Sequence, residues 1–191
     1  MGKLMVTEFI SLDGVVEDPG GSEDHPHGGW SFEYERTEES GQFKAEETLE
    51  SEAMLLGRVT YEGFAEAWPS RTGDPFSDKF NSMPKYVVTA TITDPEWNNT
   101  TVIDGSGDVA ASISARARVG LPWTMMSPSI SSLSAAIEAD LVDELRLMVF
   151  PVLLGSGKTL FGDSESKKKW KLSRLEAMGD EGVYVQVLEP A

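Results

Sequence analysis

The sequence predicts an α/β protein, a three-layer sandwich whose central sheet is mainly parallel and carries antiparallel strands at one edge. Short apolar runs, typical of buried strands, alternate along the chain with segments whose apolar residues recur every three or four positions, as in amphipathic helices. The last part instead alternates apolar and polar residues on both sides of a turn at 179–182, which predicts an antiparallel hairpin. With 191 residues and no internal repeat, one domain spanning 1–191 is expected.

Each expected element follows from a local pattern. The expected strands, read from apolar runs that end at turn-forming residues, are residues 4–12, 53–56, 85–89, 101–103, 123–126, 145–154, 172–175 and 183–188. The expected helices are one with the face Ala45, Leu49 and Ala53, one with Tyr61, Phe64, Ala65 and Trp68, a short one near Lys79, one capped by Asp108 and ended by Gly120, and one with Ile130, Leu133, Ile137 and Leu141. Thr60 is expected to cap the second helix and Pro69 to end it.

Composition excludes several classes of protein. The formal net charge of −16 argues against nucleic acid or an anionic membrane surface as a partner, because both would be repelled. The absence of cysteine excludes disulfides and thiolate chemistry. No apolar run is long enough to span a membrane, and Glu8 interrupts the N-terminal run, so a cytoplasmic location is expected. His25 and His27 lie in a polar loop that we interpret as solvated, with no metal site.

The segment around Gly57 predicts a phosphate site. The strand at 53–56 delivers Gly57, Arg58 and Thr60 to the start of a helix, where free backbone N–H groups and the helix dipole favour an anion. Arg58 would add a forked, permanently charged donor. The alternative is an ordinary strand-to-helix turn with a surface arginine.

In open parallel sheets, ligands bind beyond the carboxyl ends of the strands. Asp13, Gly14, Gly57, Arg58 and Thr89 all follow or end predicted strands, so we expect them at one edge. On so acidic a chain, Arg58, Lys85 and Lys158 would have to supply the local positive field for an anionic ligand.

The chain resembles the dihydrofolate reductase-like proteins of the RibD C-terminal type over nearly its whole length. The segments that carry the resemblance are Ser11-Leu12-Asp13-Gly14, residues 55–62 around Gly57-Arg58, residues 84–89 (Pro-Lys-Tyr-Val-Val-Thr), and residues 141–147 leading to 151–161. The resemblance implies the three-layer dihydrofolate reductase-like fold, a homodimer, and an NADPH-dependent reductase. The implied small-molecule substrate is a flat heterocycle, such as a riboflavin-pathway pyrimidine or a pterin.

The same resemblance assigns roles to single residues. Asp13 is the candidate for assisting proton transfer, although a loop aspartate that caps its own turn is the alternative. The implied cofactor-binding residues are Gly57, Arg58, Thr60, Thr89, Thr91, Ser127 and Ser129. The implied substrate-binding residues are Gly14, Trp30, Phe150 and Pro151. Trp30 belongs to an alternating aromatic cluster with Phe32 and Tyr34, which either lines the pocket or anchors a loop on the core.

Two departures from the family pattern concern the cofactor. Residues 125–129 read Met-Met-Ser-Pro-Ser where relatives carry glycines that meet the pyrophosphate, so only the hydroxyls of Ser127 and Ser129 and a helix start remain there. Ala90 stands where relatives often place a polar residue beside the 2′-phosphate.

Three hypotheses therefore stay open. The first is a reductase that uses NADPH or NADH, the second a non-catalytic small-molecule-binding member of the same fold, and the third a purely structural dimerising domain that pairs through residues 145–154 and the C-terminal hairpin.

Overall fold

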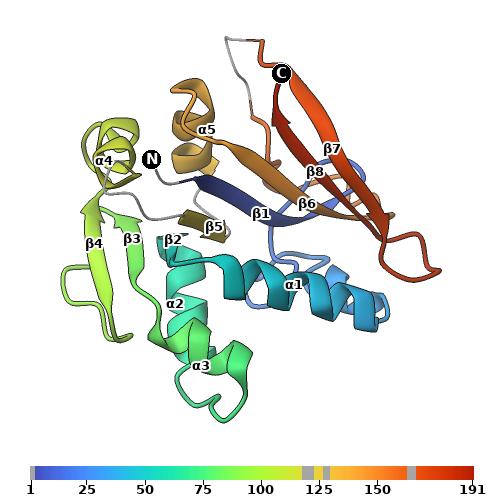
Figure 1. Cartoon of the computed structure of the whole chain (residues 1–191), viewed down its shortest axis with the longest axis horizontal. Coiled ribbons are helices and arrows are strands. Elements are labelled where there is room, and N and C mark those ends of the chain that lie inside the picture. The colour runs from blue at the N-terminus through green and yellow to red at the C-terminus, as the bar shows by residue number, and fades with distance from the viewer. Residues whose placement is uncertain (1–2, 118–122, 127–129, 163–166) are drawn as a thin grey trace.

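The computed structural model describes residues 3–117, 123–126, 130–162 and 167–191 of the protein (Figure 1). Within them, eight strands form one sheet in the order β4-β3-β2-β5-β1-β6-β8-β7. The strands are β1 (Leu4–Ser11), β2 (Ala53–Gly57), β3 (Lys85–Thr89), β4 (Thr100–Asp104), β5 (Trp123–Met126), β6 (Glu144–Phe150), β7 (Trp170–Ala177) and β8 (Tyr184–Pro190). The helices are α1 (Glu38–Glu50), α2 (Arg58–Ala67), α3 (Pro75–Ser82), α4 (Val109–Ala117), α5 (Ile130–Glu138) and the 3₁₀ turn η1 (Trp30–Glu33).

The sheet has the predicted mixed topology. β1 lies at its centre and pairs in parallel with β5 and β6, while β2 pairs in parallel with β5 and β3, and β3 with β4. Only β8, paired with β6, and its hairpin partner β7 give antiparallel contacts. Because six neighbouring strands run the same way, their carboxyl ends meet at one edge of the sheet.

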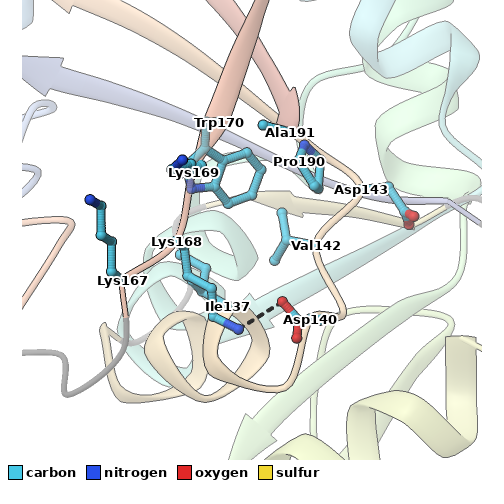
Figure 2. Close-up of a pocket in the computed structure, with 10 residues that line it drawn as sticks. All are labelled: Ile137, Asp140, Val142, Asp143, Lys167, Lys168, Lys169, Trp170, Pro190 and Ala191. Atoms are coloured by element: carbon cyan, nitrogen blue, oxygen red, sulfur yellow. Dashed lines mark hydrogen bonds and ion pairs between the residues drawn. The ribbon is translucent and has the colours of Figure 1, made fainter.

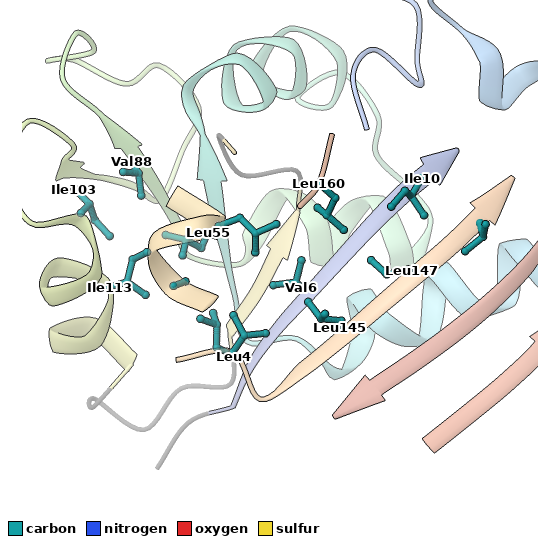
Figure 3. Close-up of a cluster of buried hydrophobic side chains, with 14 residues drawn as sticks. Leu4, Val6, Ile10, Leu55, Val88, Ile103, Ile113, Leu145, Leu147 and Leu160 are labelled. Atoms are coloured by element: carbon teal, nitrogen blue, oxygen red, sulfur yellow. The ribbon is translucent and has the colours of Figure 1, made fainter. Parts of the chain in front are cut away.

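Helices cover both faces of the sheet, which confirms the three-layer prediction. On β2, Leu55 packs in a core cluster with Ile113 of α4 and Leu133 of α5 (Figure 3). Its neighbours Met54 and Leu56 point to the other face, where they pack in a second cluster that contains aromatic side chains of α2 and α3. Every residue of β2 is buried, as the apolar run predicted. No helix among the described residues is long and apolar enough to cross a membrane.

Two predicted boundaries were wrong. Helix α2 begins at Arg58 with Gly57 as its N-cap, so Thr60 is the third helical residue and not the cap. Strand β6 ends at Phe150 and does not continue to residue 154. Pro151 has no N–H with which to extend the ladder, and the pairing with β8 ends where Val149 meets Tyr184.

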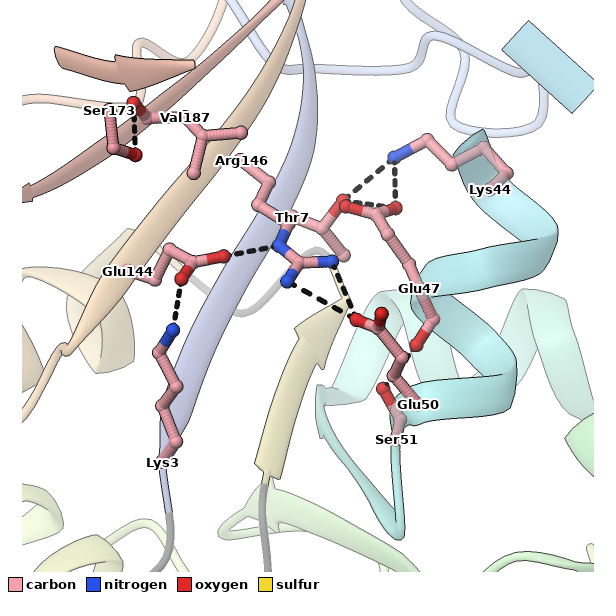
Figure 4. Close-up of polar contacts among 10 residues, drawn as sticks. All are labelled: Lys3, Thr7, Lys44, Glu47, Glu50, Ser51, Glu144, Arg146, Ser173 and Val187. Atoms are coloured by element: carbon pink, nitrogen blue, oxygen red, sulfur yellow. Dashed lines mark hydrogen bonds and ion pairs between the residues drawn. The ribbon is translucent and has the colours of Figure 1, made fainter. Parts of the chain in front are cut away.

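The predicted buried face of α1 was also wrong. Leu49 is 52% exposed, whereas Phe43, Glu47 and Thr48 are buried. The helix buries charged groups against the sheet because they find partners there (Figure 4). Lys44 of α1 pairs with Glu47 at 2.9 Å, and in the same layer Arg146 of β6 pairs with Glu144 at 2.5 Å and with Glu50 at 3.4 Å. A search for apolar periodicity does not detect a face of this kind.

Ion pairing decides the charge state in this layer. Burial acts to raise the pKa of Glu144, but hydrogen bonds from Lys3 and Arg146 outweigh it and leave this pKa below its ordinary value. Glu144 is therefore ionised at neutral pH although it is only 4% exposed.

Lys85 was expected to contribute positive charge at the ligand edge, and the structure contradicts this. As the first residue of β3, it lies at the amino edge of the sheet and is fully buried. Its ammonium donates hydrogen bonds to the carbonyl oxygens of Asn81 at 2.7 Å, Met83 at 3.0 Å and Asn98 at 3.2 Å, and lies 4.3 Å from the ring centroid of Trp97. Lys85 therefore ties the end of α3 to the segment before β4.

Lys85 should make stability depend on pH. Burial lowers the pKa of Lys85 to about 8, against about 10.4 in an unfolded chain. Between these values the unfolded chain holds a proton that the folded protein has released, so this contribution to the free energy of unfolding rises with pH. From pH 7 to pH 10, wild type should gain about 2 kcal/mol relative to Lys85→Met in urea-induced unfolding.

The matched control for this measurement is Lys171→Met, which removes an exposed lysine from β7. The difference between wild type and this control should stay constant over the same pH range. A constant difference for Lys85→Met as well would contradict the lowered pKa.

Candidate active site

The carboxyl edge of the parallel strands brings most of the predicted site residues together. Asp13 and Gly14 follow β1, Gly57 ends β2, Thr89 ends β3, and Phe150 ends β6. From β3 to β6 there are four strand-to-strand steps, which amounts to about 19 Å along the edge. One edge therefore offers room for an elongated ligand with its two ends over different strands.

Arg58 stands at the start of α2, as predicted. Gly57 has no side chain to cap the helix, and no side-chain cap of this helix start is found among the described residues. The guanidinium is exposed and donates to Glu62 at 2.7 Å, one turn along the same helix. An exposed pair of this spacing is worth about 0.3–0.5 kcal/mol, so an incoming anion would compete with Glu62 for Arg58.

The hydroxyl of Thr89 is engaged in its own turn. It accepts hydrogen bonds from the backbone N–H of Thr91 at 3.1 Å and of Ile92 at 3.3 Å, and it lies 3.3 Å from the hydroxyl of Thr91. Thr89 is buried, whereas Thr91 is exposed. Of these two predicted cofactor-binding residues, Thr91 is thus the one open to a ligand, and Thr89 fixes its position.

Asp13 ties two loops of the edge together. One carboxylate oxygen accepts from the hydroxyl of Ser11 at 2.6 Å, and the other accepts from the backbone N–H of Leu154 at 3.1 Å and of Gly155 at 2.8 Å. The hydroxyl of Ser11, followed by the N–H of Gly155, holds the pKa of Asp13 below its ordinary value. Asp13 is thus ionised at neutral pH, which suits an acceptor, and its part in proton transfer stays a prediction.

Gly14 forms the turn after β1. Its φ of +86° is a left-handed conformation that favours glycine, and a Cβ at this position would meet nothing within 4 Å. The space above Gly14 is therefore open to a ligand.

The polar loop after β1 is held against the loop 155–159. Glu17 forms an ion pair with Lys158 and accepts from its backbone N–H at 3.0 Å, while His25 Nε2 lies 3.2 Å from the carbonyl of Ser156. Because His25 Nδ1 accepts from the N–H of His27 at 3.1 Å, a neutral His25 donates through Nε2. Lys158 is therefore neutralised. Of the three predicted cations, Arg58 is the one that lies at the edge and has no partner from another element among the described residues.

Trp30 anchors this loop on the core. It is 1% exposed, donates through its ring N–H to the carbonyl of Glu17 at 2.9 Å, and packs edge-on against Phe150 with ring centroids 5.3 Å apart. Phe9 and Tyr34 contact the same Phe150 ring at 5.3 Å and 5.4 Å. Of the two interpretations of Trp30, the geometry favours loop anchoring, with an indirect effect on any ligand through Phe150.

A cavity of about 140 Å³ opens beside Phe150 at the carboxyl ends of β1 and β6. Neither Trp30 nor Pro151 lines it. Its lining residues are Phe9, Ser31, Glu35, Arg36, Ser40, Gly41, Lys44, Met148, Phe150, Met178 and Val183. Sequence reasoning missed Lys44, because the pattern placed the wrong face of α1 against the sheet; a lysine within a mixed charged and aromatic stretch gave no other signal.

A larger cavity, of about 370 Å³, lies at the opposite edge of the sheet (Figure 2). It is bounded by Trp170, Lys167, Ile137 and the C-terminal residues Pro190 and Ala191. Lys168 crosses it to Asp140 at 2.7 Å. None of the predicted site residues reaches this cavity, so the smaller one is the better candidate for a ligand. Ser127 and Ser129, the remaining predicted contacts, lie outside the described residues.

Comparison with known proteins shows which family the chain belongs to. The RibD C-terminal domain family matches residues 2–116 and 125–184. The uncharacterized protein YwjB of Bacillus subtilis (strain 168) is 25% identical over 177 residues, covering 93% of this chain and 92% of that protein. A putative riboflavin biosynthesis protein from Shewanella sp. PV-4 superposes with a TM-score of 0.70 at 20% identity, covering 99% of each chain.

Dihydrofolate reductase from Enterococcus faecalis, solved in complex with NADP(H) and RAB-propyl, superposes with a TM-score of 0.62 at 16% identity, covering 99% of this chain and 96% of that one. At these identities the superpositions show a shared fold. The match to the family over most of the chain goes further, and this protein belongs to the RibD C-terminal domain family.

Proposed function

We propose that the protein is an NADPH-dependent reductase that transfers a hydride from the nicotinamide to a small heterocyclic metabolite. The observation that carries the proposal is the joint placement, on one sheet edge, of the uncapped helix start at Arg58 and the aromatic cavity beside Phe150. Membership of the RibD C-terminal domain family supports it, as does the likeness to a dihydrofolate reductase solved with NADP(H).

The proposed cofactor would lie across the strand ends. Its phosphates would meet Arg58, the N–H groups of α2 and Thr91, and its nicotinamide would approach Gly14 and the cavity. A charge-assisted hydrogen bond to phosphate is worth about 1.5–3 kcal/mol, more than the exposed pair with Glu62. Arg58 would therefore exchange Glu62 for the cofactor. The chemistry itself needs little more than placing the nicotinamide next to the acceptor and excluding water.

A non-catalytic, ligand-binding member of the same fold is the second candidate. It is favoured by the sequence at 125–129, where proline and side chains replace the expected glycines, and by the engagement of Thr89 in its own turn. Binding of the dinucleotide separates the two candidates.

NADPH should raise the stability of the protein and Arg58 should carry part of the effect. A micromolar site at millimolar cofactor stabilises the fold by about 4 kcal/mol through mass action, which a thermal unfolding curve detects. Arg58→Ala should weaken NADPH binding about tenfold or more, measured by nicotinamide fluorescence. Glu62→Gln should keep or improve affinity, because it removes the carboxylate that competes for Arg58 and repels phosphate.

Arg71→Ala is the matched control, since Arg71 stacks on Trp68 beyond the far end of α2 at 4.6 Å. Its affinity for NADPH should equal that of wild type. If neither NADPH nor NADH shifts the unfolding curve, the reductase proposal fails; if Arg58→Ala binds as tightly as wild type, the phosphates bind elsewhere.

We also propose a homodimer that pairs through the outer hairpin. β7 is the last strand of the sheet, and Leu172 and Leu175 on it are 49% and 59% exposed. A register shift between Leu172 and Arg174 leaves Ser173 as an extra residue, so Leu172 and Leu175 point to the same face of the strand. An exposed apolar pair beside an open strand edge is a typical site of association.

Charge on this face should break the dimer. In analytical ultracentrifugation, wild type should sediment as a dimer, and Leu172→Glu/Leu175→Glu should sediment as a monomer with an unchanged circular dichroism spectrum. Leu49→Glu, on the exposed face of α1, should leave the dimer intact. A monomeric wild type, or a dimer that survives the double substitution, would exclude this interface.

A further inference from the structure

Lys44 is the lysine that lines the cavity beside Phe150. Its ammonium donates to the hydroxyl of Thr7 at 2.7 Å and to Glu47 at 2.9 Å, and lies 5.0 Å from the ring centroid of Phe9 (Figure 4). Thr7 in turn donates to the same oxygen of Glu47 at 2.9 Å. α1 and β1 thus fix the ammonium at the wall of the cavity, and its position does not depend on solvent.

Glu47 carries an unusual feature. It is 3% exposed, and its second oxygen, Oε1, has no hydrogen-bond partner within the part of the chain that the structure describes. A buried carboxylate oxygen without a partner costs stability, so such groups are rare in native proteins and each one calls for a physical explanation. The buried carboxylate of Glu47 also provides an acceptor that holds the ammonium of Lys44 in place. We take this as the reason that its burial is tolerated.

The ammonium keeps a donor for a ligand. A lysine side chain has three protons to donate, and two of them have described partners, Thr7 and Glu47. The cavity walls beside it are the rings of Phe9 and Phe150, whose planes meet at 61°, together with Met148. These walls favour a flat ring, and the third proton favours an oxygen acceptor on that ring.

A second cationic side chain lies at the rim of the cavity. Arg36 lines it with its guanidinium 4.6 Å from the ring centroid of Phe32, and no ion pair of Arg36 is found among the described residues. Glu35 is the one carboxylate among the lining residues, and its backbone N–H is bound to Glu181. Lys44 and Arg36 therefore bring two cationic donors to this cavity, beside the carboxylates of Glu35 and Glu47.

We propose that Lys44 determines the specificity of this cavity, that Glu47 is the residue that positions it, and that the ligand is a flat ring presenting a carbonyl oxygen or a carboxylate to the ammonium. This inference rests on the proposed function only in taking the cavity as the substrate side of the site. A protonated ring that presents only N–H donors to Lys44 is disfavoured, because an ammonium has no acceptor to offer it.

Binding of small probes to the protein without cofactor tests the proposal. Orotate and uracil present ring carbonyls, and orotate adds a carboxylate, whereas 2,4-diaminopyrimidine at a pH where it is protonated has the same ring with the opposite charge. By NMR titration, wild type should bind orotate more tightly than uracil and should not bind the cation. Lys44→Met should weaken orotate binding about tenfold or more, and Lys44→Gln provides a second variant should Lys44→Met not fold.

The control Lys167→Met removes an exposed lysine at the opposite edge with the same change of net charge, and its orotate affinity should equal that of wild type. Orotate binding that is unchanged in a folded Lys44 variant, or equal binding of the cation to wild type, would overturn the proposal. NADPH is titrated in parallel. NADPH binding without binding of orotate or uracil overturns this inference alone, and orotate binding without NADPH binding removes the reductase while keeping Lys44.

A double-mutant cycle tests the positioning role of Glu47. Glu47→Gln keeps the size of the side chain and one acceptor oxygen, and should lower orotate affinity several-fold while Lys44 is present. In the Lys44→Met background the same change should have no effect on orotate affinity, because there is no ammonium left to hold. Equal losses in both backgrounds would mean that Glu47 acts on the fold alone, and would overturn its assigned role.

Discussion

The parallel pairing of β1 with its two neighbours is the constraint on which the rest of this molecule depends. β1 contributes seven register positions to its ladder with β6, and from Leu4 to Thr7 its other side pairs with β5. Parallel order forces each connection to return across a face, which is why helices cover both sides. Parallel pairing also brings together, at one edge of the sheet, the ends of strands that are far apart in the sequence. For this reason the helix start at Arg58 and the aromatic cavity beside Phe150 lie along the same edge.

Where the sequence has a strong local pattern, it predicts the fold well. The apolar run of β2 and the spacing of Tyr61, Phe64 and Trp68 along α2 and its C-cap correspond to observed elements. Burial on both faces leaves a continuous apolar run, and burial of one stripe leaves a helical period. The predicted cap at Thr60 was wrong because α2 begins directly after β2, without the linking residues that a capping side chain needs. The predicted face of α1 was wrong because Glu47 and Arg146 are buried through partners that lie far away in the chain, and no local window contains them.

The same contrast between local pattern and tertiary contact applies to the residues of the candidate site. Sequence placed Asp13, Gly14, Gly57, Arg58 and Thr89 at one edge, because each ends or follows a parallel strand, and the family resemblance added Phe150. It did not reveal the cavity, whose walls come from β1, β6, α1 and the hairpin of β7 and β8 together. It also misjudged two of the three expected cations, Lys85 by its place in the sheet and Lys158 by its partner. Lys85 sits at the start of its strand instead of the end, and Lys158 meets Glu17 from a loop more than a hundred residues earlier. What a lysine does here is decided by tertiary neighbours, and its residue type alone says little.

The contacts of Lys85 also have a consequence for how the domain responds to a change in redox conditions. One ammonium gathers three carbonyl groups from two chain segments and caps them with an indole ring, so it acts as a cross-link made without a covalent bond. The chain contains no cysteine, so no such link can be made through sulfur. A cross-link built from an ammonium and carbonyls needs neither oxidant nor enzyme to form, and a shift from reducing to oxidising conditions leaves it intact.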